Sequence, residues 1–135
     1  MKNIKFVLAA LLLWAAPAFA QSLPPGAIPI TGNAAGTTGA VVGTLAATAG
    51  KTTFICGVSI FAIGGVAAIG PITVAGITGT SFIFQGSSSA AGGLIAERNF
   101  SPCIPASSVN TAITITTTAN GTATAVNVNS FGFQQ

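Results

Sequence analysis

Histidine and tyrosine are absent from this 135-residue sequence, which holds four basic residues and one acidic residue. Because the chain has no imidazole and only one carboxylate, Glu97, it cannot build a Ser-His-Asp triad, an acid–base pair or a zinc site. The glycine-rich stretches contain no phosphate-binding loop of the G-x-x-x-x-G-K-[ST] type. We therefore expect a protein that is not an enzyme, that holds no metal and no cofactor, and that has no evident small-molecule substrate.

Positive charge is also too scarce for nucleic-acid binding. Lys2 and Lys5 lie in a segment that we expect to be removed, which leaves Lys51 and Arg98 against Glu97. Tight binding along a phosphate backbone takes about 6–10 contacts. We therefore expect no nucleic-acid partner, although the sequence pI of 9.4 would suggest one.

Residues 1–20 have the order of parts of a secretory signal peptide. Lys2 and Lys5 are followed by the apolar run Phe6–Ala16 and by an A-x-A cleavage pattern at Ala18–Ala20. The apolar run is shorter than the roughly 20 residues of a membrane-spanning helix. We predict cleavage after Ala20 and export, so that the protein is secreted, periplasmic or on the cell surface.

Export makes the two cysteines informative, because an oxidising compartment allows thiols to pair. Cys56 and Cys103 are the only cysteines, and they stand 47 positions apart. No histidine and no C-x-x-C spacing supports a metal-binding or reactive thiol pair. We predict a structural disulfide, which for a loop of this length contributes about 4 kcal/mol on the chain-entropy model.

The remaining chain divides into an N-terminal arm and one β-domain. Residues 21–39 contain three prolines and four glycines, and this composition predicts an extended arm. From residue 40 to 135, runs rich in β-branched residues alternate with turn signals about every 8–12 residues. This spacing predicts an all-β domain, an antiparallel β-sandwich or jelly roll.

A hairpin is predicted near the C-terminus. Ala112–Ala119 and Thr122–Asn129 flank Asn120-Gly121, a pair that favours a two-residue type I′ turn. In that register Ile115 faces Val126 and Ile113 faces Val128, so that apolar side chains meet on one face and polar ones on the other.

A membrane-inserted protein is an alternative, because residues 52–96 contain no charge. Phe54–Gly70 has 17 residues, near the lower limit for a spanning helix. Gly64-Gly65, Pro71 and the many β-branched residues argue against a helix in this segment.

Four segments resemble parts of small Gly/Thr/Ala-rich all-β proteins, jelly-roll-like, of alphaproteobacteria and their phages. They are TTFICGVSI (52–60), SPCIPAS (101–107), NTAITI (110–115) and VNVNSFGF (126–133). The resemblance implies a structural, surface or virion-associated module. The signal peptide departs from that pattern and favours an exported envelope or extracellular protein.

Low charge also promotes self-association. We expect a structural or interaction protein that forms a homo-oligomer, with another envelope or surface protein as a further possible partner. A module that binds a neutral ligand such as a glycan is a second alternative. Phe131 and Phe133 are the candidate interaction surface, because exposed aromatic rings are the usual platform for such a ligand. Packing of these two rings in the core or between subunits is the alternative.

Overall fold

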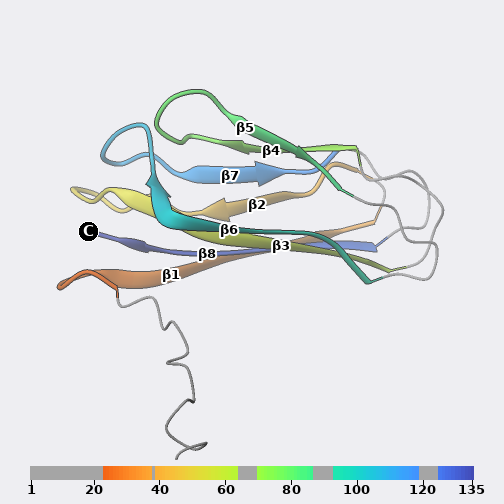
Figure 1. Ribbon diagram of the computed structural model, residues 1–135, viewed down its shortest axis with the longest axis horizontal. Helices are drawn as coiled ribbons and strands as arrows, with labels where there is room; N and C mark the ends of the chain where they lie inside the picture. The colour runs from red at the N-terminus through yellow and green to blue at the C-terminus, as the bar shows by residue number, and fades with distance from the viewer. Residues whose placement is uncertain (1–22, 38, 64–69, 87–92, 119–124) are drawn as a thin grey trace, which may run out of the picture.

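The computed structural model describes residues 23–37, 39–63, 70–86, 93–118 and 125–135 (Figure 1). The predicted signal peptide with its cleavage site at Ala20 and the predicted turn at Asn120-Gly121 lie outside the described residues. Within them, every regular element is a strand. The strands are β1 (Ile28–Gly36), β2 (Val42–Leu45), β3 (Thr53–Ile63), β4 (Pro71–Ala75), β5 (Phe82–Gln85), β6 (Gly93–Pro105), β7 (Ile113–Thr116) and β8 (Ala125–Gln134).

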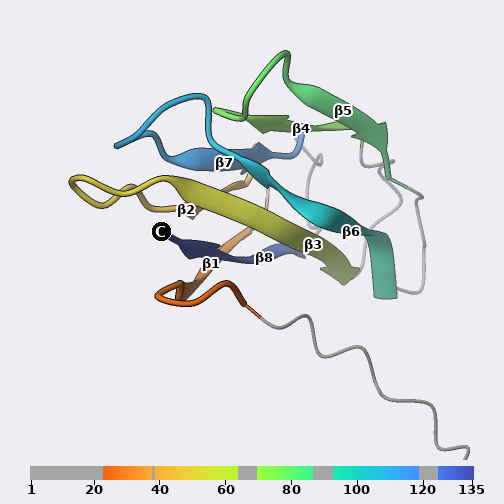
Figure 2. The same cartoon turned by 60° about the vertical axis from the view of Figure 1, so that its left-hand side comes forward.

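The strands form two four-stranded antiparallel sheets that pack as two layers (Figures 1 and 2). Sheet A has the order β1-β8-β3-β6, and sheet B has the order β2-β7-β4-β5. The pairs β1–β8 and β3–β6 therefore lie in one sheet, and β2–β7 and β4–β5 lie in the other. Eight strands that form two sheets in these orders make a jelly roll. The predicted all-β sandwich is confirmed.

Strand alternation explains how the layers hold together. In β7, Ile113 and Ile115 are fully buried. Thr114 and Thr116, which alternate with them, point to the outer face and are half-buried. In β8, Val126 and Val128 are fully buried in the same way. The apolar faces of both sheets meet in one core, which is lined mainly by isoleucine and valine. β-branched residues of this kind suit a half-buried pleated strand.

The predicted hairpin is wrong, although the faces predicted for its two strands are correct. β7 pairs with β2 and β4 in sheet B, whereas β8 pairs with β1 and β3 in sheet A. Ile115 and Val126 therefore do not face each other across a ladder, because they enter the core from opposite sheets. A strand that crosses to the other sheet still turns its alternate apolar residues towards the shared core, so the burial pattern is the same as in a hairpin.

The predicted arm also differs from the structure. Ile28–Gly36 forms β1, which pairs with β8 over its whole length. Ile30 and Ala34 on this strand pack against the core. The sandwich therefore begins at Ile28 and not at residue 40, because pairing with β8 overrides the weak strand propensity of the glycines and Asn33.

The predicted disulfide is confirmed between Cys56 and Cys103, whose Cα atoms lie 4.3 Å apart. Cys56 is the extra residue where the register of β3 shifts between Ile55 and Gly57. On β6 the ladder resumes at Ile104. The disulfide thus joins β3 and β6 at the place where their backbone pairing is interrupted, and it lies entirely within sheet A.

In the described part of the chain, no helix is long and apolar enough to cross a membrane. Of the uncharged stretch that suggested insertion, Thr53–Ile63 forms strand β3 and Pro71–Ala75 forms strand β4.

Candidate binding groove on the outer face of sheet A

The outer face of sheet A carries rows of polar side chains that the ladder brings together from strands far apart in sequence. Asn33 on β1 pairs with Asn129 on β8, which pairs with Ser59 on β3. One row along, Asn127 on β8 pairs with Phe61 on β3. Because alternate residues of a strand share a face, these side chains all point away from the core.

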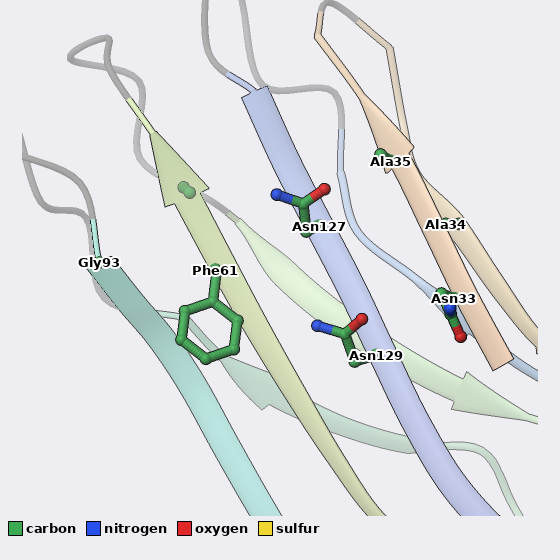
Figure 3. Close-up of a pocket in the computed structure, with 8 residues that line it drawn as sticks. Asn33, Ala34, Ala35, Phe61, Gly93, Asn127 and Asn129 are labelled. Carbon is green, nitrogen blue, oxygen red and sulfur yellow. The ribbon is translucent and has the colours of Figure 1, made fainter. Parts of the chain in front are cut away.

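A shallow groove of about 720 Å³ follows these rows (Figure 3). We call it the carboxamide groove, and define it by the residues that line it: Asn33, Ala34, Ala35, Phe61, Ala62, Gly93, Asn127 and Asn129. In Figure 3 the carboxamides of Asn127 and Asn129 follow each other along β8, with the ring of Phe61 beside them on β3. None of the lining residues is charged, so any ligand of this groove is recognised by hydrogen bonds and apolar contact.

The three carboxamides are available to a ligand. Asn33 and Asn129 are exposed and Asn127 is half-buried. Among the described residues, their side chains form no hydrogen bond with another part of the chain. Each carboxamide offers both a donor NH₂ group and an acceptor oxygen. The groove therefore presents three two-sided hydrogen-bonding groups on a rigid sheet.

Two aromatic rings mark the ends of this face. Phe61 is 39% exposed within the groove, and Phe131 is 46% exposed beyond it. Phe131 pairs with Gly57, and a Cβ atom at Gly57 would collide with the Phe131 ring, so this glycine lets the ring lie over β3. Gly57 and Phe61 are four residues apart on β3, which corresponds to about 13 Å along the strand.

The structure separates the two phenylalanines that the sequence suggested as one surface. Phe131 is exposed on the outer face of sheet A, as predicted for an interaction surface. Phe133 is only 6% exposed, because its ring stacks on Phe54 with the ring centroids 4.5 Å apart. Phe133 therefore supports the end of the sheet and does not face a ligand.

Sequence reasoning missed the groove residues Asn33, Phe61, Asn127 and Asn129. One signal was present: asparagine is rare inside strands, yet it alternates with valine in Val126–Asn129. Asn33 had no such signal, because it joins the others only through the pairing of β1 with β8.

No charged residue lines the groove, although one lies on the same face of the sheet. Glu97 on β6 is exposed and pairs with Ser59 on β3, so it extends the row of Asn33 and Asn129 by one strand. Across the ranges that the structure describes, no three His, Cys, Asp or Glu side chains gather at one place. Arg98 on β6 lies over the ring of Phe84, with its guanidinium carbon 5.5 Å from the ring centroid. This contact joins β6 of sheet A to β5 of sheet B, and neither residue lines the groove.

No protein-family model, no curated protein and no solved structure matches the chain. Its function has to be argued from the side chains themselves.

Proposed function

We propose that this protein is an exported, non-enzymatic binding module that holds a neutral saccharide in the carboxamide groove. The observation that carries the proposal is the row of three carboxamides beside the exposed ring of Phe61, in a groove that no charged residue lines. The groove volume lies within the range of roughly 300–1,000 Å³ that is usual for small-ligand sites.

The chemistry of a sugar fits these groups. Each hydroxyl of a pyranose both donates and accepts hydrogen bonds, as each carboxamide does. The C–H face of the sugar is apolar and packs on the electron-rich face of an aromatic ring. Because the site is open and extends from Phe61 towards Phe131, a short stretch of a longer chain suits it better than a single enclosed sugar.

Two further features support an exported module. The Cys56–Cys103 disulfide is compatible with an oxidising, extracytoplasmic compartment. The residues that line the groove include no general acid, general base or activated nucleophile, and the one carboxylate on this face, Glu97, lies outside the lining beside Ser59. Binding without chemical conversion is the activity that such a face supports.

The proposal is tested by native affinity electrophoresis of the exported chain in gels that contain neutral glucans or xylans. Hexasaccharides of the polymer that retards the protein are then titrated by calorimetry. We expect retardation by at least one neutral polymer, and a loss of about tenfold or more in affinity for Phe61→Ala and for Asn129→Ala.

Thr116→Ala is the matched control, because Thr116 lies half-buried on the outer face of sheet B. We expect this variant to bind as the unmodified chain does. No retardation by any neutral polymer, or an equal loss for Thr116→Ala, would contradict the proposal.

A further inference from the structure

The sandwich has four edge strands, and three of them are protected against pairing with another chain. β1 and β6 are the edges of sheet A, and β2 and β5 are the edges of sheet B. β1 contains Pro29, and β6 contains Glu97, Arg98 and two prolines, which are the residues that usually block edge pairing. β2 is covered by β1, since a Cβ atom at Gly32 would collide with the backbone oxygen of Thr44.

β5 has none of these protections. Its four residues, Phe82–Gln85, include no charge and no proline, and they pair only with β4 in the described part of the chain. β5 is the outermost strand of sheet B in both views (Figures 1 and 2). Phe82 is 40% exposed and Ile83 is 59% exposed, so this edge presents apolar side chains on both faces of the strand.

We propose that β5 pairs with β5 of a second copy of this chain, in antiparallel orientation about a twofold axis at Ile83. The sequence of this edge, Ser81-Phe82-Ile83-Phe84-Gln85, reads nearly the same in both directions. Pairing about Ile83 places Phe82 opposite Phe84 of the second copy, and Ile83 opposite its own counterpart. Ser81 then meets Gln85, so residues of the same chemical kind meet at every position. Each of these contacts occurs twice, except that of Ile83 on the axis, as a twofold interface requires.

The side chains at this edge favour that register. Phe82 already contacts Phe84 and Phe100, with centroid distances of 5.7 and 5.9 Å. Aromatic and β-branched pairs across neighbouring strands are among the stabilising cross-strand contacts. No charged residue lies on β5, so the second copy meets no like charge on that strand.

The pairing has a geometric consequence for the groove, which rests on the proposed function. Antiparallel pairing of identical edges requires a twofold axis perpendicular to the joined sheet. Both copies of sheet A then lie on the same side of the joined sheet B. The two carboxamide grooves therefore face the same way, and a polymer that reaches both is held with greater avidity than a short oligosaccharide.

The test is sedimentation equilibrium of the exported chain over a range of concentrations. We expect a monomer–dimer equilibrium with a dissociation constant on the order of micromolar, because a short edge buries little surface. Ile83→Lys places two like charges opposite each other and should raise this constant about tenfold or more. Val42→Lys is the matched control, since Val42 is 48% exposed on the other edge strand of sheet B.

A mixture of Ile83→Lys and Ile83→Glu chains separates loss of pairing from loss of folding. We expect the mixture to recover the dimer, because opposite charges then meet at the axis. A chain that stays monomeric, a closed oligomer larger than a dimer, or a dimer that Val42→Lys breaks as strongly as Ile83→Lys would overturn the proposal.

Retention on an immobilised polysaccharide tests the consequence for the groove. Ile83→Lys should reduce retention while leaving the affinity for a hexasaccharide unchanged. If the unmodified chain binds no saccharide, the proposed function fails, while the sedimentation result still decides the pairing of β5.

Discussion

The outer faces of the two sheets rest on the same core but differ in the residues they carry. Sheet B presents Thr44, Thr73, Thr114 and Thr116, which are directly paired across its strands. Such β-branched residues favour strands. Sheet A presents asparagines, which strands disfavour. Strand stability alone accounts for the face of sheet B, whereas the face of sheet A carries residues that cost stability and therefore call for a functional reason.

The largest test of this contrast removes the disulfide, whose two cysteines both lie in sheet A. We expect Cys56→Ala combined with Cys103→Ala to lower the free energy of unfolding by about 4 kcal/mol, measured by denaturant titration. The 47-residue span that the disulfide closes sets this magnitude.

The loss should also be uneven between the sheets. Amide hydrogens of β6 should exchange faster relative to those of β7, because β6 is an edge strand tied to β3 by the disulfide. The unmodified chain under reducing conditions is the control and should behave as the double variant does. Equal acceleration in both sheets would show that the disulfide does not act on sheet A locally.

A smaller effect is expected where sheet A is tied to the segment that follows β2 of sheet B. Gln134, at the end of β8, is 4% exposed and donates a hydrogen bond of 2.7 Å to the carbonyl oxygen of Ala46. We expect Gln134→Ala to lower the free energy of unfolding by about 2 kcal/mol, since it removes this bond and buried contacts.

Gln135 provides the matched control for this position. Its side chain is exposed, and it joins the fold through backbone hydrogen bonds with Thr52. We expect Gln135→Ala to change the stability by less than about 0.5 kcal/mol. Similar losses for the two variants would mean that the Gln134 carboxamide does not join the layers.

The sequence predicted the layers of this fold better than its connections. The alternation in β7 and β8 correctly identified Ile113, Ile115, Val126 and Val128 as inward-facing. It could not identify their partners, because a period of two specifies which face is buried and leaves the neighbouring strand open. In a jelly roll, successive strands often change sheets, so a local turn signal such as Asn-Gly is a weak guide to pairing.

The candidate site was less accessible to sequence reasoning for a related reason. Asn33 and Asn129 are 96 positions apart and meet only because β1 pairs with β8. Phe131 was recognised, since it is a large aromatic residue in an alternating strand. Phe133 is two residues further along the strand, so the alternation places it on the same face as Phe131. Only the stacked ring of Phe54 makes Phe133 buried while Phe131 is exposed.

The smallest expected effect on stability is the most informative about function. We expect Asn127→Thr combined with Asn129→Thr to raise the free energy of unfolding by about 0.5 kcal/mol per residue, because threonine is the better strand former. The same variant should lose saccharide binding, since two of the three carboxamides of the groove are gone while the fold is intact. Denaturant titration and calorimetry on one preparation measure both quantities.

The reciprocal exchange on sheet B completes the comparison. Thr114→Asn combined with Thr116→Asn should lower the stability by a similar amount of about 0.5 kcal/mol per residue, and it should leave binding unchanged. A gain of stability together with a loss of binding on sheet A, and the opposite sign with no loss on sheet B, would mark the asparagines as residues retained for a ligand. If the asparagine-to-threonine exchange destabilises the chain instead, these side chains support the strands, and their presence on sheet A does not indicate a binding role.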